Sequence, residues 1–193
     1  MTNENRFNLL INNISEYFIK KFNISISKDL SIEDLLGLKS VLSNVNNMLT
    51  YKTTLSFVNW LSQKRNFTTV QKDSIIQQID SISPNANGYD VDISEPERIL
   101  AEVKTTIPIN NSKGFGSAQR KSIIKDLQKL SRPENSSALK FMVLLDNENV
   151  RDAFTKEKSF VKKLKDESLH TEVVINTTNF SYKNTIYVVF VHF

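Results

Sequence analysis

Apolar side chains recur at three- and four-residue steps through the first third of the chain, with Asn, Ser, Lys and Glu between them. This spacing is typical of amphipathic helices. The apolar stripes cover residues 7–18, 35–49, 51–61 and 70–82, and they predict four helices.

Two local signals mark the ends of these helices. Ser31, followed three residues later by Asp34, is typical of a capping arrangement at the start of the second helix. Ser83-Pro84 and the turn-rich residues 85–88 end the fourth helix.

Beyond Gly88 the pattern changes from helical to alternating. Residues 89–93 and 98–105 each place apolar side chains on one face and polar ones on the other, and a short connection separates them. We therefore expect an antiparallel hairpin with an acidic face. The outward side chains of its two strands are Asp90, Asp92, Glu102 and Lys104.

The second half of the chain alternates helical and extended patterns. A helix is expected over 117–130, followed by Pro133, and another over 149–165. The apolar run 139–145 has the profile of an interior strand that is covered on both faces. Strands at 171–175 and 185–193 complete the order. The prediction is an α/β protein with a central mixed sheet flanked by helices.

Composition excludes several kinds of site. The 193 residues contain no cysteine and only two histidines, His170 and His192, so thiolate zinc sites, cysteine nucleophiles and multi-histidine metal sites are ruled out or disfavoured. Hydrophobic residues make up 39%, and no stretch approaches the roughly 20 apolar residues of a membrane span. The first ten residues also lack a signal-peptide pattern, so we expect a cytoplasmic protein.

The predicted hairpin brings residues near Asp90 opposite residues near Glu102, so that two carboxylates can converge on one hard cation such as Mg²⁺. The Val103 backbone carbonyl can add a third oxygen. Lys104 then lies beside the metal, where an ammonium can orient a water or stabilise charge on an attacked phosphate. This combination suits phosphodiester hydrolysis.

An aspartate on one strand and an E-x-K triplet on the next resemble the PD-(D/E)xK nuclease superfamily, which includes type II restriction endonucleases. The resemblance rests on Gly88 to Ile93 and on Ile99 to Lys104. It implies a restriction-endonuclease-like core within 67–193. The N-terminal helical region before that core, 1–66, can serve dimerisation or DNA contact, or it can brace the sheet. The family's metal-binding and catalytic positions fall on Asp90, Glu102 and Lys104.

The sequence departs from the family pattern in two places. No proline precedes Asp90, and no clear first strand of the family's three-stranded meander lies between Ile82 and Tyr89. Asp92 fits the same face as Asp90, so the aspartate assignment can shift by two. The candidate accessory residues of the site are Asp80, Asp92, Gln119 and Lys121.

Positive charge gathers after the motif. Residues 104–167 carry 14 Lys and Arg against 8 Asp and Glu, whereas the whole chain has a net charge of only +4. Such a surface can neutralise phosphates, although a solvated helix face explains it equally well. The candidate DNA-binding residues in and before helix 117–130 are Lys113, Ser117, Arg120, Lys121, Lys125 and Lys129.

These observations predict a Mg²⁺-dependent endonuclease, of the type II restriction class, that cuts double-stranded DNA as a homodimer. Two alternatives stay open. One is a catalytically silent nucleic-acid-binding or protein-interaction module with the same fold. The other is a junction-resolving or repair nuclease.

Overall fold

The computed structural model describes residues 3–27, 29–81, 88–108, 114–174, 180 and 184–192. The chain divides into two compact units, Met1–Val45 and Asn46–Phe193. The first unit holds helix α1 (Asn3–Phe22) and the start of helix α2 (Ile32–Arg65). The second unit holds the remainder of α2 and every other described element.

Helix α2 begins at the predicted cap. The Asp34 backbone N–H donates to Ser31 Oγ at 3.1 Å, and Asp34 Oδ2 accepts from the Ser31 N–H at 2.9 Å. The separate helices expected over 35–49 and 51–61 are wrong, because α2 continues through both. No glycine or proline interrupts the chain between them, and the Thr53 hydroxyl bonds back to the Leu49 carbonyl across the expected joint.

Within the described residues, five strands form one mixed sheet with the order β1-β2-β3-β5-β4, which confirms the predicted α/β class. The β1–β2 pair is antiparallel, and the other neighbours are parallel. The strands are β1 (Val91–Ile93), β2 (Ile99–Lys104), β3 (Leu139–Leu145), β4 (Thr171–Val173) and β5 (Ile186–Val191).

The hairpin has the expected register. Val91 pairs with Ala101 and Ile93 with Ile99, so Asp90, one residue before β1, falls opposite Glu102. The connection between the strands is fastened to the end of α2, where Arg65 makes two bonds, of 2.6 and 2.8 Å, to the Glu97 carboxylate.

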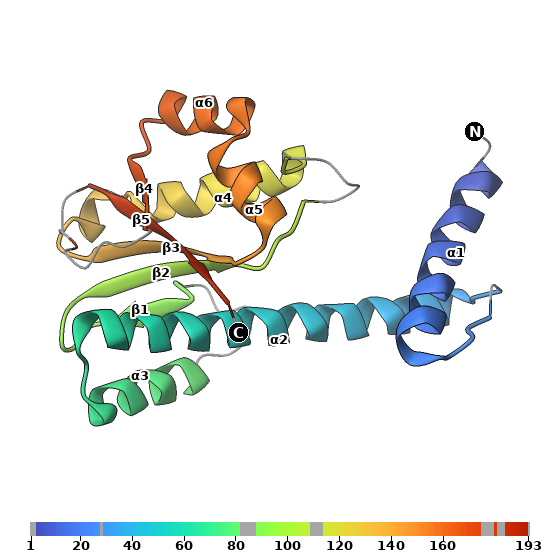
Figure 1. The fold of residues 1–193 in the computed structure, drawn as a ribbon, viewed down its shortest axis with the longest axis horizontal. Helices are drawn as coiled ribbons and strands as arrows, with labels where there is room; N and C mark the ends of the chain where they lie inside the picture. Colours follow the sequence, from blue (N-terminus) through green and yellow to red (C-terminus); the bar gives the residue numbers. More distant parts are fainter. Residues whose placement is uncertain are drawn as a thin grey trace. The chain divides into compact units, whose positions relative to one another are not determined.

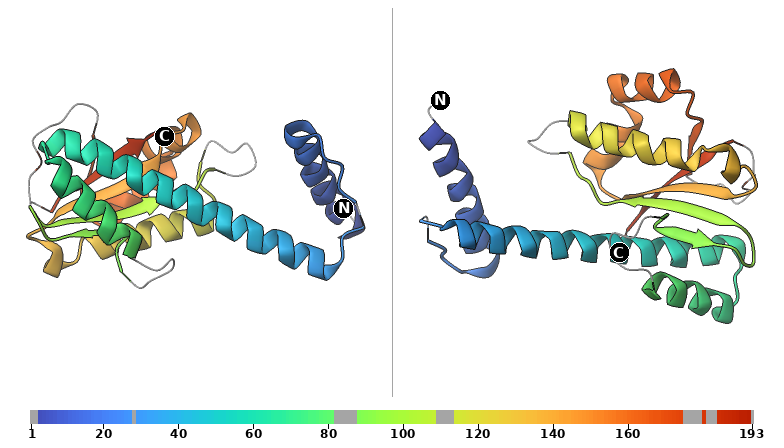
Figure 2. Two further views of the ribbon diagram at one scale, coloured as in Figure 1. Left: turned by 90° about the horizontal axis from the view of Figure 1, so that it is seen from below. Right: turned by 180° about the vertical axis from the view of Figure 1, so that it is seen from behind.

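Helices cover both faces of the sheet (Figures 1 and 2). On one face lie α4 (Ser117–Leu130), α5 (Glu148–Thr155) and α6 (Lys158–Asp166), whose buried side chains pack with Leu100, Met142 and other residues of β2, β3 and β5. On the other face lie the second half of α2 and α3 (Thr69–Ser81). Helix α2 packs on the sheet from Phe57 onward, and the unit that contains the sheet is Asn46–Phe193.

One further helix differs from its prediction. The helix expected over 149–165 is two helices, α5 and α6, although the segment contains no glycine or proline. Glu157 lies at the break, outside helical geometry, and its carboxylate accepts bonds from Arg120 at 2.8 Å and from the Phe115 backbone N–H at 3.2 Å. These partners lie about 40 residues earlier, and so the break depends on tertiary contacts.

A short 3₁₀ turn, Pro133–Asn135, joins α4 to β3. In the part of the chain that the structure describes, none of the helices combines the length and apolar character required to span a membrane.

Candidate active site at the end of strand β2

Asp90 is fixed at the point where the β1–β2 ladder ends. Its Oδ2 accepts a hydrogen bond of 2.7 Å from the Val103 backbone N–H. In an antiparallel pair, the N–H and C=O of one residue face the same neighbouring strand. The Val103 carbonyl therefore faces the same side as Asp90.

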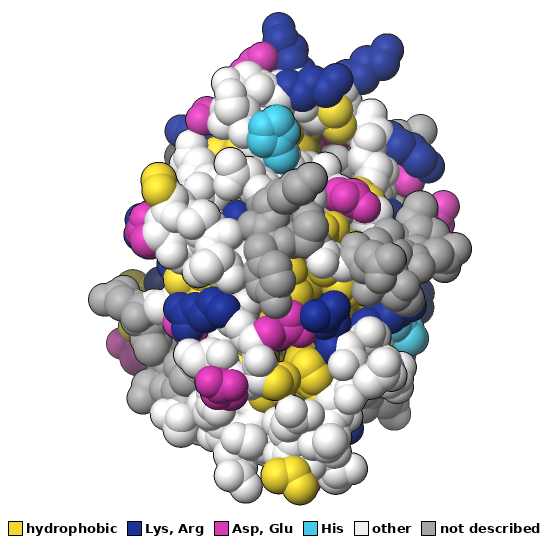
Figure 3. Space-filling model, turned by 90° about the vertical axis from the view of Figure 1, so that its left-hand side faces the viewer, with side chains coloured by type: hydrophobic (Ala, Val, Ile, Leu, Met, Phe, Trp, Pro, Cys, Tyr) yellow, Lys and Arg dark blue, Asp and Glu magenta, His cyan; other side chains and the backbone are white. Residues whose placement is uncertain are grey.

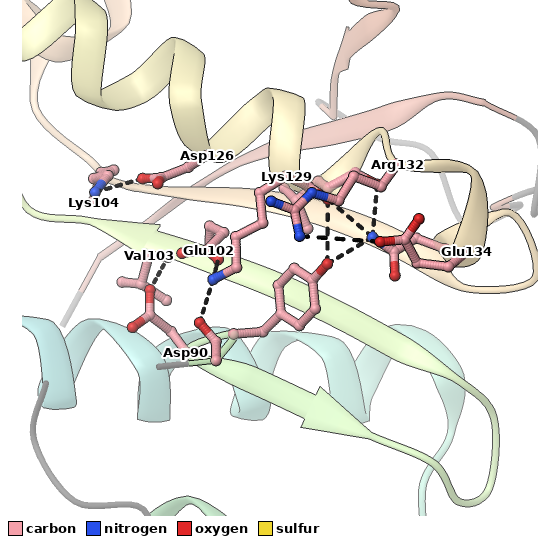
Figure 4. Close-up of polar contacts among 12 residues, drawn as sticks. Asp90, Glu102, Val103, Lys104, Asp126, Lys129, Arg132 and Glu134 are labelled. Atoms are coloured by element: carbon pink, nitrogen blue, oxygen red, sulfur yellow. Dashed lines mark hydrogen bonds and ion pairs between the residues drawn. The ribbon is translucent and has the colours of Figure 1, made fainter. Parts of the chain in front are cut away.

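Glu102 points toward α4, and only 5% of the residue is exposed. Its Oε1 contacts the ammonium of Lys129, a residue in the last turn of α4, and the same ammonium contacts the Gly88 carbonyl oxygen (Figure 4). The Lys129 ammonium also lies 4.4 Å from the centre of the Tyr89 ring.

Lys104 pairs with a residue that sequence reasoning missed. Its Nζ lies 2.5 Å from Oδ2 of Asp126 on α4. This ion pair is the contact that the structure gives to Asp126 Oδ2, which is buried. Asp126 is the only acidic residue of α4, and it lies one helical turn before Lys129. A lone carboxylate in a basic helix was the signal that could have found it.

The end of α4 is anchored to the segment before β1 through its backbone. The Tyr89 hydroxyl donates to the Lys129 carbonyl at 3.2 Å, and the Asn135 amide donates to the same carbonyl at 2.9 Å. Asn135 also donates to the Tyr89 hydroxyl at 2.6 Å. These bonds hold Lys129 over Glu102 without using its ammonium.

The crowding of carboxylates changes how they titrate. Burial raises the pKa of Glu102 from 4.5 to about 7, the Lys129 hydrogen bond opposes the shift, and the charges of Asp90 and Asp126 add to it. Burial also raises the pKa of Asp90, against the lowering effect of the Val103 N–H and the charge of Lys104. Charged carboxylates are therefore costly here unless a cation lies among them.

The two alternative acidic candidates lie in other surroundings. Asp92, on β1, is exposed and pairs with Arg98. Asp80, on α3, is exposed and accepts a 2.7 Å hydrogen bond from the Tyr51 hydroxyl. The structure brings neither into contact with Asp90, Glu102 or Lys104, whereas the hairpin register places Asp90 opposite Glu102.

The candidates at the start of α4 have mixed surroundings. Gln119 has a structural role, because its Oε1 accepts from the Gly116 N–H and its Nε2 donates to the Ile107 carbonyl, both at 2.8 Å. Arg120 is engaged by Glu157. Ser117, Lys121 and Lys125 are exposed, whereas Lys113 lies outside the described residues.

Surface charge is uneven on the face that Figure 3 shows. Acidic and basic side chains lie together across its middle, and Lys and Arg side chains gather at the end where α6 lies in Figure 1. Of the candidate DNA-binding lysines on α4, Lys121 and Lys125 are exposed, whereas Lys129 is directed to Glu102.

No group of three or more acidic or histidine side chains forms a ready metal-ligand set within the described residues. The donors nevertheless fit a hard cation. Asp90, Glu102 and Asp126 supply carboxylate oxygens, the Val103 carbonyl faces the same side as Asp90, and the buried Asp126 Oδ2 has a cation, the Lys104 ammonium, as its partner. Two lysine ammoniums now pair with two of these carboxylates, Lys104 with Asp126 and Lys129 with Glu102.

Comparison with family models, with curated proteins and with solved structures finds no match to this chain. The functional assignment accordingly depends on the residues and their geometry.

Proposed function

We propose that this chain is a Mg²⁺-dependent endonuclease of the PD-(D/E)xK type, a hydrolase that cleaves phosphodiester bonds of double-stranded DNA and most closely fits the type II restriction class. The observation that carries the proposal is the meeting of Asp90, Glu102 and Lys104 at one end of the β1–β2 pair. The raised pKa of Glu102 supports it, because buried carboxylates with perturbed pKa values are common at functional sites.

The order of elements also supports the proposal. Strand β2 carries the E-x-K triplet, α4 follows it, and β3 returns parallel to β2. The resemblance to the PD-(D/E)xK superfamily implies the same order from the hairpin onward. The first strand expected in that core would fall near residues 82–87, which lie outside the described residues.

Each motif residue has a defined part in this proposal. Asp90, Glu102 and the Val103 carbonyl would hold Mg²⁺, which acts as a Lewis acid and lowers the pKa of bound water. Lys104 places an ammonium at the same end of β2, where it can stabilise the charge that grows on an attacked phosphate. Asp126, paired with Lys104 at 2.5 Å, would orient that ammonium.

The test is cleavage of plasmid and long linear DNA with Mg²⁺ by the wild type and by three variants. Asp90→Asn and Lys104→Ala should lose cleavage by at least a hundredfold, because each removes a group from the site. Asp92→Asn is the matched control: it changes the same residue type two positions away on an exposed face, and it should cut normally. Full cleavage by Lys104→Ala would remove Lys104 from the mechanism.

One observation favours a second candidate, the catalytically silent binding module. Lysines already pair with Glu102 and Asp126, as in a purely structural charge network. Binding of DNA by the wild type without cleavage in Mg²⁺ or Mn²⁺ would support that module. Cleavage confined to four-way junctions would instead identify a resolving nuclease, whereas discrete fragments from long DNA would identify a sequence-specific enzyme.

A further inference from the structure

Lys129 contacts the two kinds of oxygen that a hard cation prefers. Its ammonium contacts a carboxylate oxygen of Glu102 and the backbone carbonyl oxygen of Gly88. Both oxygens lie next to Asp90, since Gly88 is two residues before it in the chain and Glu102 is opposite it in the hairpin register. The ammonium therefore lies where a divalent ion bound to Glu102 would have to approach.

We propose that Lys129 is the built-in counter-ion of the carboxylate site, and that it competes with a divalent cation for Glu102. Metal binding then requires the Lys129 ammonium to withdraw from Glu102. This inference rests on the proposed function, because it concerns the same metal site, and it assigns Lys129 a positioning role that the E-x-K motif does not contain.

The surroundings of Lys129 allow such an exchange. The side chain remains 26% exposed, and it is a flexible four-carbon stem with a path to solvent. The helix does not depend on the ammonium for its anchorage, since Tyr89 and Asn135 bind the Lys129 backbone carbonyl. Lys129 can therefore release Glu102 while α4 stays in place.

Charge balance favours the exchange. Asp90, Glu102 and Asp126 form a group of three carboxylates, and Lys104 and Lys129 supply two ammoniums. With all five groups ionised, the cluster keeps one negative charge. A divalent cation in place of the Lys129 ammonium would bring it to neutrality, whereas Lys104 stays paired with Asp126.

The test compares Mn²⁺ affinity, measured by titration calorimetry without DNA, in the wild type, Lys129→Met and Lys125→Met. Lys125 is one helical turn earlier on α4 and is exposed, so its variant controls for loss of a nearby positive charge. We expect Lys129→Met to bind Mn²⁺ at least tenfold more tightly than the wild type. Lys125→Met should change the affinity less than twofold.

A second variant keeps the test decisive if Lys129→Met is unstable without metal. The double variant with Lys129→Met and Glu102→Gln removes both charged partners. It should fold in EDTA and bind Mn²⁺ no more tightly than the wild type. Lys129→Met should then recover its melting temperature in Mn²⁺ but not in NaCl of equal ionic strength.

The outcomes separate the two proposals. If folded Lys129→Met binds Mn²⁺ no more tightly than Lys125→Met, or the gain persists without the Glu102 carboxylate, the counter-ion role of Lys129 is refuted and the nuclease proposal stands. If neither the wild type nor Lys129→Met binds Mn²⁺ or Mg²⁺ at all, both proposals fail.

Discussion

Replacing Glu102 with Gln should change how the stability of the metal-free protein depends on pH. The Glu102 carboxyl has a pKa of about 7 in the folded chain against an ordinary value of 4.5, and burial is the main cause. The folded state thus binds the proton more tightly than the unfolded state does, so the free energy of unfolding must fall as pH rises from about 4.5 through 7. Only 7% of this side chain is exposed, so solvent screening is small.

The size of the effect follows from the shift. At 1.36 kcal/mol per pKa unit, the ionised Glu102 side chain costs the folded state about 3 kcal/mol by pH 8. Asp90 contributes in the same direction, because its pKa is also raised. The hydrogen bond from Arg151 lowers the pKa of Asp146, so the ionisation of Asp146 raises the unfolding free energy as pH rises. This rise is complete by about pH 5.

The assay is urea denaturation in EDTA at constant ionic strength, at half-unit steps from pH 5 to pH 8. The wild type should lose about 2.5 kcal/mol of unfolding free energy over this range, because part of the loss is already complete at pH 5, and Glu102→Gln should lose less than half as much. Glu134→Gln, at an exposed glutamate, should follow the wild type. A Glu102→Gln variant with the full wild-type slope, or a wild type that gains stability toward pH 8, would refute the reasoning.

Two further predictions concern α4. Leu127 is fully buried between α4 and the sheet, so Leu127→Ala should lower the unfolding free energy by about 2–5 kcal/mol in urea denaturation, and a loss below about 1 kcal/mol would contradict the packing described. Lys121 and Lys125 are exposed, so changing both to Ala should weaken DNA binding in fluorescence anisotropy and reduce the slope of log affinity against log salt by about 2, with an unchanged slope counting against phosphate contact.

The elements that were predictable from the sequence are those whose signals are local. Helix α4 has the predicted bounds, Ser117–Leu130, because its apolar stripe is regular and Pro133 follows. The run 139–145 is a strand buried on both faces, as its unbroken apolar composition indicates. The hairpin register followed from side-chain alternation, because a slip of one residue would turn Val91 and Ile93 out of the core.

The errors came from contacts that are distant in the sequence. Helix α2 continues past Thr50 as one helix, and its buried apolar side chains, which pack with those of the sheet, all lie in its second half. The end of α5 is set by Glu157, which meets Phe115 and Arg120 only after the chain has folded. Neither feature has a local signal such as proline or glycine.

The candidate site likewise combines residues with a local sequence signal and residues that are brought in by distant contacts. Asp90, Glu102 and Lys104 were predictable, because two short strands with a tight connection fix which side chains meet. Asp126 and Lys129 come from a helix whose rotation about its axis is set by the buried row Ile123, Leu127 and Leu130. Because that row faces the sheet, the polar residues beside it on α4 lie next to β2. They therefore meet the charged side chains of β2, Glu102 and Lys104. An acid and a base one turn apart on this side of α4 can each neutralise the opposite charge on β2, and this explains why Lys104 finds Asp126 while Glu102 finds Lys129.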